Sequence, residues 1–495
     1  MDHASHGLRV QLASYNAGEQ FDAPPVPDLT EWLIPTVSES RQSGYATSPR
    51  PARVANPVME RGPREAPDVY AVAFQEFAPL PHSLAGRTLS MVSRVDKEIR
   101  RAIRLHQSVV RDDNMYDPLE MGGGPENYVC VAQVSHAGLV LYVYVRERAG
   151  QSPAARRRPS AAQRVKEVRT AFVGTGLGSI MGNKGAVGVR IAMASLVQGA
   201  PDEVMTFVCA HLAAHDHEVS RRNKDWRQIV QRLVFEPEGV VPLPVLQTAE
   251  SAPPSQHAPP PPDPLEPVEY SLYDTHHLFV MGDLNYRVDT GVQGVPRKEN
   301  TQPPPPIDKK AVREVARSFD ARRWASILPY DQLLREHTAG RTLQGLHLPD
   351  LASWAVPPTY KYKAGGEMLQ LSQKRLPGWP DRLLWGSSDA ARGSAAVACE
   401  LYRSLLRYTA SDHKPITAIV QLPWQLDRRS VFMRRPYEID PQWRRWRIIG
   451  VVLDRIVGYL WSFLLLFGNG HLYLAFAELA LLGLLSWYWL QGRWL

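Results

Sequence analysis

Short apolar runs recur along this chain, and many of them end directly at a polar side chain. Runs of this length, bounded by turn residues, are typical of buried β-strands. They lie at 8–16, 69–74, 129–133, 139–146, 170–173, 205–210, 278–281 and 416–422. Helical spacing with many charges appears between them, at 88–107, 217–234, 310–326 and 330–337. Strands and helices that alternate in this way predict an α/β protein with a layered sandwich architecture.

The segment 278–287 shows the pattern most clearly, because four apolar residues run straight into Gly-Asp-Leu-Asn. Alternate residues of a strand point to the same side, so Asp283 and Asn285 are expected to share a face. A carboxylate that takes a proton from water, beside an amide that orients the same water, would suit catalysis. The alternative is a strand followed by an Asx turn, in which both side chains satisfy backbone groups. This segment alone does not decide between the two.

The composition is that of an ordinary globular protein, with 44% hydrophobic and 22% charged residues in a chain of 495. The 42 prolines are clustered, which predicts disordered insertions near 41–65, 149–164, 237–268 and 291–308. The net charge of +7 favours an anionic partner such as a phosphate, nucleic acid or an acidic membrane surface. The three cysteines lack the spacing of a zinc site, and the N-terminus has no apolar stretch typical of a signal peptide.

Carboxylates and amides at the strand ends are suited to a hard metal ion. Glu76 and Asn16 offer oxygen ligands, and Mg²⁺ usually takes only one or two carboxylates from a protein. Asp412 is a candidate to assist this metal, while Asp283 could accept a proton from the attacking water. The sequence therefore predicts a magnesium site next to a general base.

Two histidines complete the set of polar strand ends. His211 and His413 can donate hydrogen bonds to phosphate oxygens, and Asp381 could hold His413 in the required tautomer. A single histidine at a strand end is more often a satisfied structural residue. Six polar residues at six separate strand ends are harder to explain by structure alone.

Several motifs, taken together and in this order, resemble the inositol polyphosphate 5-phosphatases, which belong to the endonuclease/exonuclease/phosphatase folds. The resemblance covers residues 8–424. Its Glu, Gly-Asp-Leu-Asn and Ser-Asp-His parts are shared with related nucleases, whereas Asn-Lys-Gly and Pro-Thr-Tyr-Lys-Tyr point to inositol phosphates. The motifs lie at 75–76, 181–185, 211–215, 221–223, 282–287, 358–362, 379–382 and 411–415.

This resemblance implies a four-layered α/β sandwich, in which two packed β-sheets are flanked by helices, as a catalytic domain over 1–425. It also implies a role for each candidate residue. Glu76 and Asn16 would hold Mg²⁺, Asp283 and Asn285 would activate and position water, His211 and His413 would clamp the scissile phosphate with Asp381 and Asp412 assisting, and Asn183, Lys184, Tyr360, Lys361 and Arg375 would bind the substrate, the last three at its 4-phosphate.

The chain departs from the family pattern at two places that concern the site. The first strand ends in Ser-Tyr-Asn-Ala where the family often has Trp-Asn-Val, which affects the assignment of Asn16. A lysine that the family often carries two residues before Arg375 is Gln373 here, and Lys374 is one residue off. The contact with the 4-phosphate is therefore expected to differ.

The C-terminal tail begins with a basic linker at 426–447, which holds seven arginines against three acids. Two apolar runs follow at 448–490, and each is about 20 residues, long enough to span a bilayer. We expect a transmembrane helical hairpin with both ends in the cytosol, since basic residues flank it. The alternatives are a hairpin packed on the catalytic domain, which Asp454, Arg455 and Glu478 favour, or one interfacial helix with one true span.

Together these features predict a monomeric Mg²⁺-dependent phosphoinositide 5-phosphatase that is embedded in a membrane and does not bind nucleic acid. Its first expected substrate is phosphatidylinositol 4,5-bisphosphate, with the 3,4,5-trisphosphate second, at a cytosolic membrane face. The resemblance extends to fungal tail-anchored members of the family and implies the endoplasmic reticulum. A nuclease or other phosphodiesterase of the same fold is the main alternative, and an inactive membrane scaffold is a third hypothesis.

Overall fold

The computed structural model describes most of the chain, apart from the ends and several internal segments. The described residues are 7–34, 66–104, 127–147, 159–196, 199–237, 268–296, 301–318, 320–365, 369–388, 397–422, 432–468 and 471–492. The predicted insertion at 41–65 therefore lies outside the described residues, as do 149–158 and 238–267. Disorder in those segments stays a prediction, as does the domain boundary at 425.

One mixed sheet of the described structure contains six strands in the order β10-β11-β1-β2-β4-β3. Its strands β1 and β2 run parallel, and its other neighbours run antiparallel. The bounds are β1 Arg9–Asn16, β2 Val69–Gln75, β3 Tyr128–His136, β4 Leu139–Arg146, β10 Ala398–Ser404 and β11 Ile416–Gln421.

A second mixed sheet contains five strands in the order β5-β6-β7-β8-β9. Here β7 and β8 form the parallel pair. The bounds are β5 Val165–Gly174, β6 Gly185–Met193, β7 Glu203–His211, β8 His277–Asp283 and β9 Asp381–Ser387.

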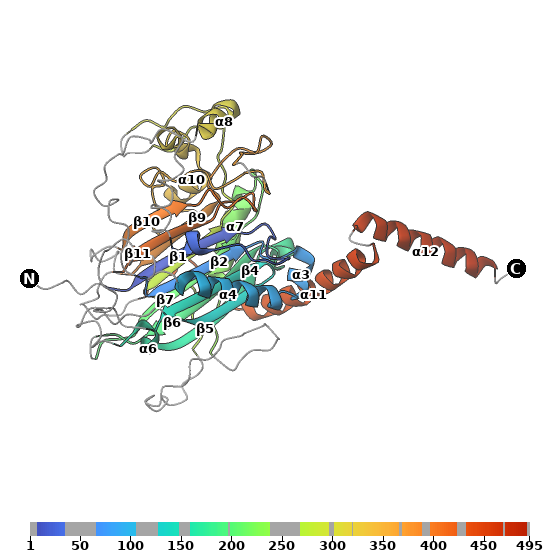
Figure 1. Ribbon diagram of the computed structural model, residues 1–495, viewed down its shortest axis with the longest axis horizontal. Helices are drawn as coiled ribbons and strands as arrows, with labels where there is room; N and C mark the ends of the chain where they lie inside the picture. The colour runs from blue at the N-terminus through green and yellow to red at the C-terminus, as the bar shows by residue number, and fades with distance from the viewer. Residues whose placement is uncertain are drawn as a thin grey trace, which may run out of the picture.

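The two sheets face each other, and a large apolar cluster fills the space between them (Figure 1). Alternate residues of a strand point to opposite faces. In β2, Val69, Ala71 and Ala73 join this inner cluster, while Tyr70 and Phe74 face the outer side of the sheet. Both faces of β2 are therefore buried, which explains why its sequence is continuously apolar instead of alternating.

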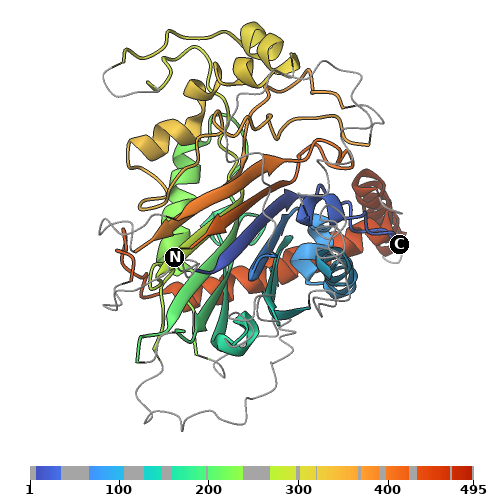
Figure 2. The same cartoon turned by 60° about the vertical axis from the view of Figure 1, so that its left-hand side comes forward.

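Helices cover the outer faces of both sheets, which makes four layers (Figure 2). The first sheet is covered by α1 Thr30–Leu33 and α4 Leu89–Arg104, with α3 Leu80–Ala85 near its end. The second sheet is covered by α7 Val219–Arg232, which buries Trp226 and Ile229. Shorter helices lie in the connections, namely α6 Ala161–Arg164, α8 Lys309–Arg317, α9 Ala321–Trp324 and α10 Gln332–Thr338, with 3₁₀ turns η2 Leu177–Ser179 and η3 Leu328–Tyr330.

The predicted architecture of two packed sheets flanked by helices is confirmed, and the predicted strands are present. Strand β10 was missed, because its pattern is only partly apolar and three of its residues are charged or polar at half-buried positions. The proline-rich segment 291–308 was expected to be disordered, yet its described parts are joined by backbone hydrogen bonds. Gly291 N donates to Ile307 O at 3.1 Å and Gly294 N donates to Pro304 O at 3.0 Å.

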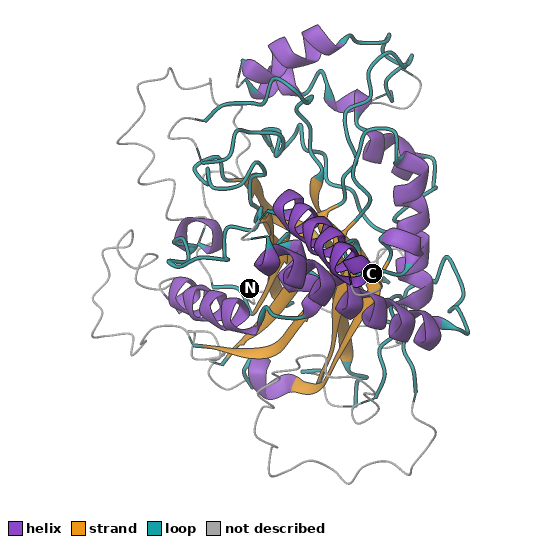
Figure 3. Cartoon of the chain, turned by 90° about the vertical axis from the view of Figure 1, so that its right-hand side faces the viewer, coloured by secondary structure: helices purple, strands orange, loops and turns teal. Residues whose placement is uncertain are grey.

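The tail forms two helices, α11 Trp443–Phe467 and α12 Leu472–Gly492. Among the described residues, α11 is the one helix with an apolar stretch long enough to be a candidate span, and 473–487 in α12 is a shorter apolar stretch. However, α11 lies against the catalytic domain for much of its length, whereas α12 projects away from it (Figure 1). Figure 3 looks from the side of the C-terminus, where helices lie in front of the sheets. The buried positions of α11 are Trp443, Gly450, Val451, Asp454 and Gly458. The predicted hairpin that crosses a membrane twice is therefore not confirmed, and packing on the domain holds for the first part of α11.

Candidate active site

The pairing of the second sheet brings three candidate residues into one row. In the register of β7, β8 and β9, His211 is opposite Asp283, and Asp283 is opposite Asp381. His211 ends β7, Asp283 ends β8 and Asp381 begins the antiparallel β9, so all three lie at one edge of the sheet. This is why the apolar runs of β7 and β8 stop at a polar residue in the sequence. The row is almost fully buried, with exposures of 4%, 1% and 1%.

The backbone before Asp283 requires glycine. Gly282 has φ +147°, and a Cβ at this position would overlap the backbone of Ala210 on the neighbouring strand. Only glycine allows this approach of β7 and β8 without strain. The close approach fixes the position of Asp283 relative to His211.

Asn285 does not continue the strand, so the prediction that it shares a strand face with Asp283 is wrong. Strand β8 ends at Asp283, and Asn285 has φ +57°, in the left-handed region. Its backbone N–H donates to Asp283 Oδ1 at 3.0 Å, while its Nδ2 donates to Leu212 O at 3.1 Å. The Asx turn considered as an alternative is thus real, and it uses only one oxygen of Asp283.

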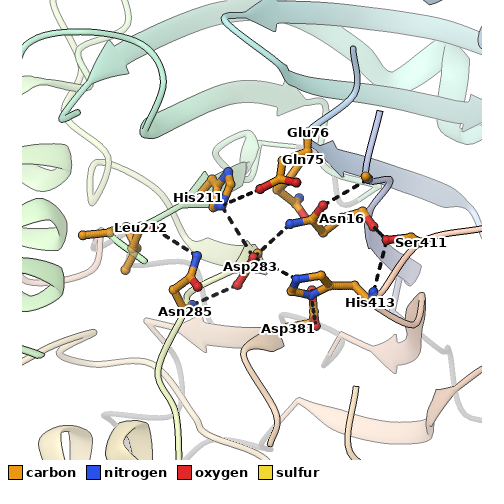
Figure 4. Close-up of polar contacts among 12 residues, drawn as sticks. Asn16, Gln75, Glu76, His211, Leu212, Asp283, Asn285, Asp381, Ser411 and His413 are labelled. Carbon is orange, nitrogen blue, oxygen red and sulfur yellow. Dashed lines mark hydrogen bonds and ion pairs between the residues drawn. The ribbon is translucent and has the colours of Figure 1, made fainter. Parts of the chain in front are cut away.

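The other oxygen of Asp283 is the centre of the site (Figure 4). Asp283 Oδ2 accepts a hydrogen bond from Asn16 Nδ2 at 2.9 Å. It also lies 3.5 Å from His211 Nε2 and 3.7 Å from His413 Nε2. Asn16 comes from the end of β1, so both sheets contribute to the contacts of this single oxygen.

His413 is held by a second carboxylate on the opposite side of its ring. Its Nδ1 lies 2.9 Å from Asp381 Oδ2, which also accepts a hydrogen bond from the Thr359 hydroxyl at 2.6 Å. The ring of Tyr360 packs against the imidazole, with centroids 4.4 Å apart. These contacts fix both the orientation of the ring and the position of its proton at Nδ1 when the ring is neutral.

The charges of the site follow from this arrangement. Burial disfavours a charged ring, but Asp381 and Asp283 outweigh it and raise the pKa of His413 to about 9. Burial also opposes ionisation of Asp283, yet His413 and His211 together hold the pKa of this carboxyl below its ordinary value. For His211, burial and the nearby Lys184 ammonium lower the pKa well below its ordinary value. A charged His413, an ionised Asp283 and a neutral His211 are expected near neutral pH.

Oxygen donors for a metal come from Glu76 and Asn16. Glu76 follows β2 directly, has φ +46° and places its Oε1 3.8 Å from His211 Nε2. A left-handed conformation is unfavourable by roughly 1–2 kcal/mol for a residue with a Cβ, so the surrounding structure must impose it. Asn16 Oδ1 accepts only a long bond, 3.2 Å, from Gly18 N–H, which leaves a lone pair for another partner. A carboxylate and an amide oxygen are the donor types that Mg²⁺ or Ca²⁺ takes.

Asp283, Asp381 and His413 also place ligand atoms within 4.8 Å of one another. This geometry could hold a metal ion. However, Asp381 Oδ2 is already bonded to His413 and Thr359, so the hydrogen-bonded arrangement explains the closeness of these groups without an ion.

Lys361 follows Tyr360, which packs on His413, and the side chains of Lys361 and Arg375 are partly exposed; we call this partly exposed side of the site its mouth. Both residues make contacts that the sequence did not suggest. Lys361 Nζ lies 2.7 Å from Asp412 Oδ2, and Arg375 Nη1 lies 3.9 Å from Asp216 Oδ2. Ser372 N donates to Lys361 O at 2.7 Å, so the segment that leads to Arg375 runs beside Lys361. Asp412, predicted to assist the metal, thus pairs with a substrate-binding candidate, and its role at a metal stays a prediction.

Asn183 and Lys184 lie in the turn between β5 and β6. Asn183 Oδ1 accepts from Leu177 N at 3.2 Å, and Lys184 O accepts from Thr175 N at 2.8 Å. The next residue, Gly185, pairs with His211 in the register of β6 and β7. The turn therefore adjoins the catalytic row, and Lys184 is close enough to affect the pKa of His211.

Two further residues of the site were quoted in motifs but given no role. Arg287, 9% exposed, donates to Asn285 Oδ1 and lies with its guanidinium carbon 4.0 Å from the centre of the Tyr360 ring. Thr359 is fully buried and donates to Asp381. Sequence position could have drawn attention to both, because Thr359 directly precedes Tyr360 and Arg287 lies two residues after Asn285.

Comparison with known proteins identifies the family to which this chain belongs. The profile of endonuclease/exonuclease/phosphatase family 2 matches residues 13–419. The chain belongs to this family. The predicted relationship is confirmed at this level, and relatives of the chain include proteins named as inositol 5-phosphatases.

Among these relatives, human synaptojanin-2 is 24% identical over 446 residues, covering 84% of this chain and 23% of that protein. The mouse type II inositol 1,4,5-trisphosphate 5-phosphatase is 24% identical and covers 76% of this chain and 28% of that protein. The chain thus spans about a quarter of these relatives. The inositol polyphosphate 5-phosphatase domain of SPsynaptojanin, solved with inositol (1,4)-bisphosphate and calcium, has a TM-score of 0.52 at 19% identity over 91% of this chain and 90% of that one. It supports the fold.

Proposed function

We propose that this protein is a Mg²⁺-dependent phosphoinositide 5-phosphatase that converts phosphatidylinositol 4,5-bisphosphate to phosphatidylinositol 4-phosphate. The observation that carries this proposal is the buried row of His211, Asp283 and Asp381, joined to His413 and opening beside Lys361. The family shares its hydrolytic core with nucleases, so the choice of an inositol phosphate rests on the residues at the mouth. The names of the relatives agree with this choice.

The residues of the core divide the work of hydrolysis. A charged His413 and the neutral His211 donate hydrogen bonds to the oxygens of the scissile phosphate. Asp283 is held ionised by the same two rings, so it accepts a hydrogen bond from the attacking water and orients it, while its low pKa makes it a weak base. Phosphate hydrolysis depends mainly on positioning and charge neutralisation, which a weak base does not limit.

A metal ion fits the Glu76 and Asn16 end of this arrangement. When bound there, Mg²⁺ would neutralise charge on the phosphate and polarise its oxygens. The residues of the chain hold its donors in place: Asn16 is fixed by its bond to Asp283, and Glu76 by a left-handed backbone. Oxygen donors are the preferred ligands of magnesium and are shared with calcium.

Cations around the mouth favour a second phosphate next to the scissile one. Lys361 and Arg375 lie on neighbouring segments, and each forms an ion pair with a partly exposed carboxylate. An incoming phosphate, which carries more charge, can compete for such pairs because exposed ion pairs are weak. Arg287 offers two further N–H groups, Nε and Nη1, that have no hydrogen-bond partner among the described residues. This supports a substrate with a 4-phosphate.

The tail would keep the enzyme at its lipid substrate. In the structure, α11 is packed on the domain up to Gly458, and the remaining part, 459–467, would extend only about 13 Å. That is less than half the hydrocarbon thickness of a bilayer, about 30 Å. Helix α12 has 21 residues, or about 31 Å, and its described side chains from Tyr473 onward are almost all exposed and apolar. We therefore favour one membrane span through α12, with α11 lying along the cytosolic face of the membrane. Location in the endoplasmic reticulum and a monomeric state remain expectations from the sequence.

Phosphate release from short-chain phosphatidylinositol 4,5-bisphosphate tests the activity, using the full chain in detergent with Mg²⁺. Wild type should release one phosphate and leave phosphatidylinositol 4-phosphate, and Asp283→Ala should be at least about a thousandfold slower. A single-stranded oligonucleotide serves as the control substrate. Equal release by Asp283→Ala, or cleavage of the oligonucleotide in preference to the lipid, would overturn the proposal.

A protease-protection experiment tests the membrane arrangement. An epitope placed after residue 495 should be protected in sealed microsomes if α12 is the single span, and accessible if α11 and α12 form a hairpin. An epitope at the N-terminus, expected to be accessible in both cases, is the control.

A further inference from the structure

The packed part of α11 contacts the turn that carries Asn183 and Lys184 through one side chain, Asp454. Asp454, in the middle of α11, is 2% exposed. Both of its carboxylate oxygens lie 3.0 Å from the backbone nitrogen of Gly182, directly before Asn183. This buried backbone N–H therefore has the carboxyl group of Asp454 as its acceptor, and a buried donor that loses its acceptor is costly. The helix therefore holds the backbone of this turn.

A second contact extends this connection to the loop between β3 and β4. His136 Nε2 lies 3.4 Å from Asp454 Oδ2. Two residues later, Gly138 O accepts a hydrogen bond at 3.0 Å from Phe77 N, and Phe77 directly follows Glu76. Asp454 thus contacts the Lys184 turn directly, and it is connected to the segment after Glu76 only through the residues 136–138.

The face of α11 that makes these contacts is built for close approach. Gly450, Asp454 and Gly458 are spaced four residues apart, so they lie on one side of the helix. A Cβ on Gly450 would overlap Ile180 O, and a Cβ on Gly458 would overlap the backbone of Ala85. Small residues at this spacing let a helix backbone pack tightly against its neighbour. An arrangement of this kind places the carboxylate of Asp454 within reach of the turn.

Electrostatics indicate that the turn reaches the catalytic row. Lys184 is half-buried, and Glu76 and Asp283 are the carboxylates whose charges act most strongly on its pKa, against the lowering by burial. A displacement of the turn would move this ammonium relative to the phosphate site. Since the turn is tied by Thr175 and Leu177 on its other side, Gly182 is the point at which α11 acts.

We propose that Asp454 is a positioning residue of the active site, through which the tail helix α11 holds the Gly182–Lys184 turn in its productive place. The tail is then part of the catalytic unit as well as a connection to the membrane. The inference rests on the proposed phosphatase function for its kinetic test, and on hydrogen exchange for a test that is independent of it.

Kinetics of full-length variants on short-chain phosphatidylinositol 4,5-bisphosphate in detergent provide the first measurement. Asp454→Ala should lower kcat about tenfold, as expected when the buried Gly182 N–H loses its acceptor. Asp454→Asn keeps an acceptor for Gly182 N–H and should stay within about twofold of wild type. Arg444→Gln, which removes an exposed pair with Glu236 at the start of α11, is the matched control and should also stay within about twofold.

A double-mutant cycle separates positioning from general destabilisation. In a Lys184→Ala background, Asp454→Ala should lower kcat less than about twofold, because the group that it positions is already gone. An equal tenfold loss in both backgrounds would overturn the inference. Should Asp454→Ala not be recovered as folded protein, Gly450→Leu and Gly458→Leu replace it, since the first wedges α11 from the turn and the second from α3. Equal losses in these two would likewise overturn it.

Amide hydrogen exchange of segment 175–185 gives the independent test. Exchange should be faster in Asp454→Ala than in wild type and Asp454→Asn, whatever the enzyme hydrolyses. Unchanged exchange in Asp454→Ala would contradict the proposal. Absence of turnover by the wild-type protein, with faster exchange in Asp454→Ala, would count against the phosphatase function and support the role of α11.

Discussion

Thr359 offers a precise way to test whether His413 acts through its hydrogen-bonded support. Its hydroxyl is fully buried and donates to Asp381 Oδ2 at 2.6 Å, the same oxygen that holds His413 Nδ1. Thr359→Val removes this donor and keeps the shape of the side chain. The free energy of unfolding should fall by about 1.5–3 kcal/mol, the range for a hydrogen bond to a charged group.

The same loss sets the scale of the kinetic effect. If all of it appears in the transition state, kcat falls about 10- to 150-fold, since each 1.36 kcal/mol corresponds to a factor of ten. KM should change less than about threefold, because Thr359 is two residues from the substrate-binding Lys361 and does not carry a charge to the phosphate. Initial rates over a range of short-chain lipid concentrations separate the two parameters.

Thr275→Val is the matched control for Thr359→Val. Thr275 is also fully buried, and its hydroxyl lies 3.0 Å from Val204 O and 2.9 Å from His277 O, at the opposite end of β8 from Asp283. The substitution should lower the melting temperature and leave kcat within about twofold. Equal losses of kcat in the two variants would refute the proposed link between Thr359 and catalysis.

Three further outcomes are expected. Lys361→Ala should raise KM about tenfold for substrates with a 4-phosphate and little for those without it; equal changes would contradict its contact with that group. Glu76→Gln should raise the Mg²⁺ concentration needed for half-maximal activity, and an unchanged requirement would exclude Glu76 as a ligand. Glu336→Gln should lower the melting temperature at pH 7, and the difference from wild type should shrink as the pH falls from about 4.5 to 2. Arg341 depresses the pKa of Glu336 to about 2, and a carboxyl with a depressed pKa stabilises the fold only while it is ionised. A difference that stays constant with pH would contradict this.

The strand ends explain how much of the site was visible in the sequence. A buried strand must be apolar on both faces between two packed sheets, so the first polar residue marks its end. That rule located Asp283, His211 and Glu76 without any structure. It could not give their register, because partners are chosen by long-range pairing. The row of His211, Asp283 and Asp381 therefore became apparent only when β7, β8 and β9 were seen side by side.

Local backbone conformation accounts for the error at Asn285. Strand periodicity assumes an extended chain, whereas Asn285 is left-handed, a conformation that asparagine tolerates better than most residues. The Asx turn and a catalytic role for Asp283 do not exclude each other, because the carboxylate has two oxygens. Oδ1 of Asp283 serves the turn and Oδ2 faces the histidines, so the turn is the device that aims the second oxygen.

The tail shows where apolar length ceases to be informative. A run of about 20 apolar residues satisfies a bilayer or a protein surface equally well, so its length cannot separate a span from a packed helix. What separates them in α11 is the spacing of Gly450, Asp454 and Gly458, which places a charge between two close-approach positions on one face. In α12 the only charged residue described is Glu478, and no comparable face contacts the domain. If Asp454 indeed acts on Gly182, then a charge that is costly in a lipid span is retained because the active-site turn requires it.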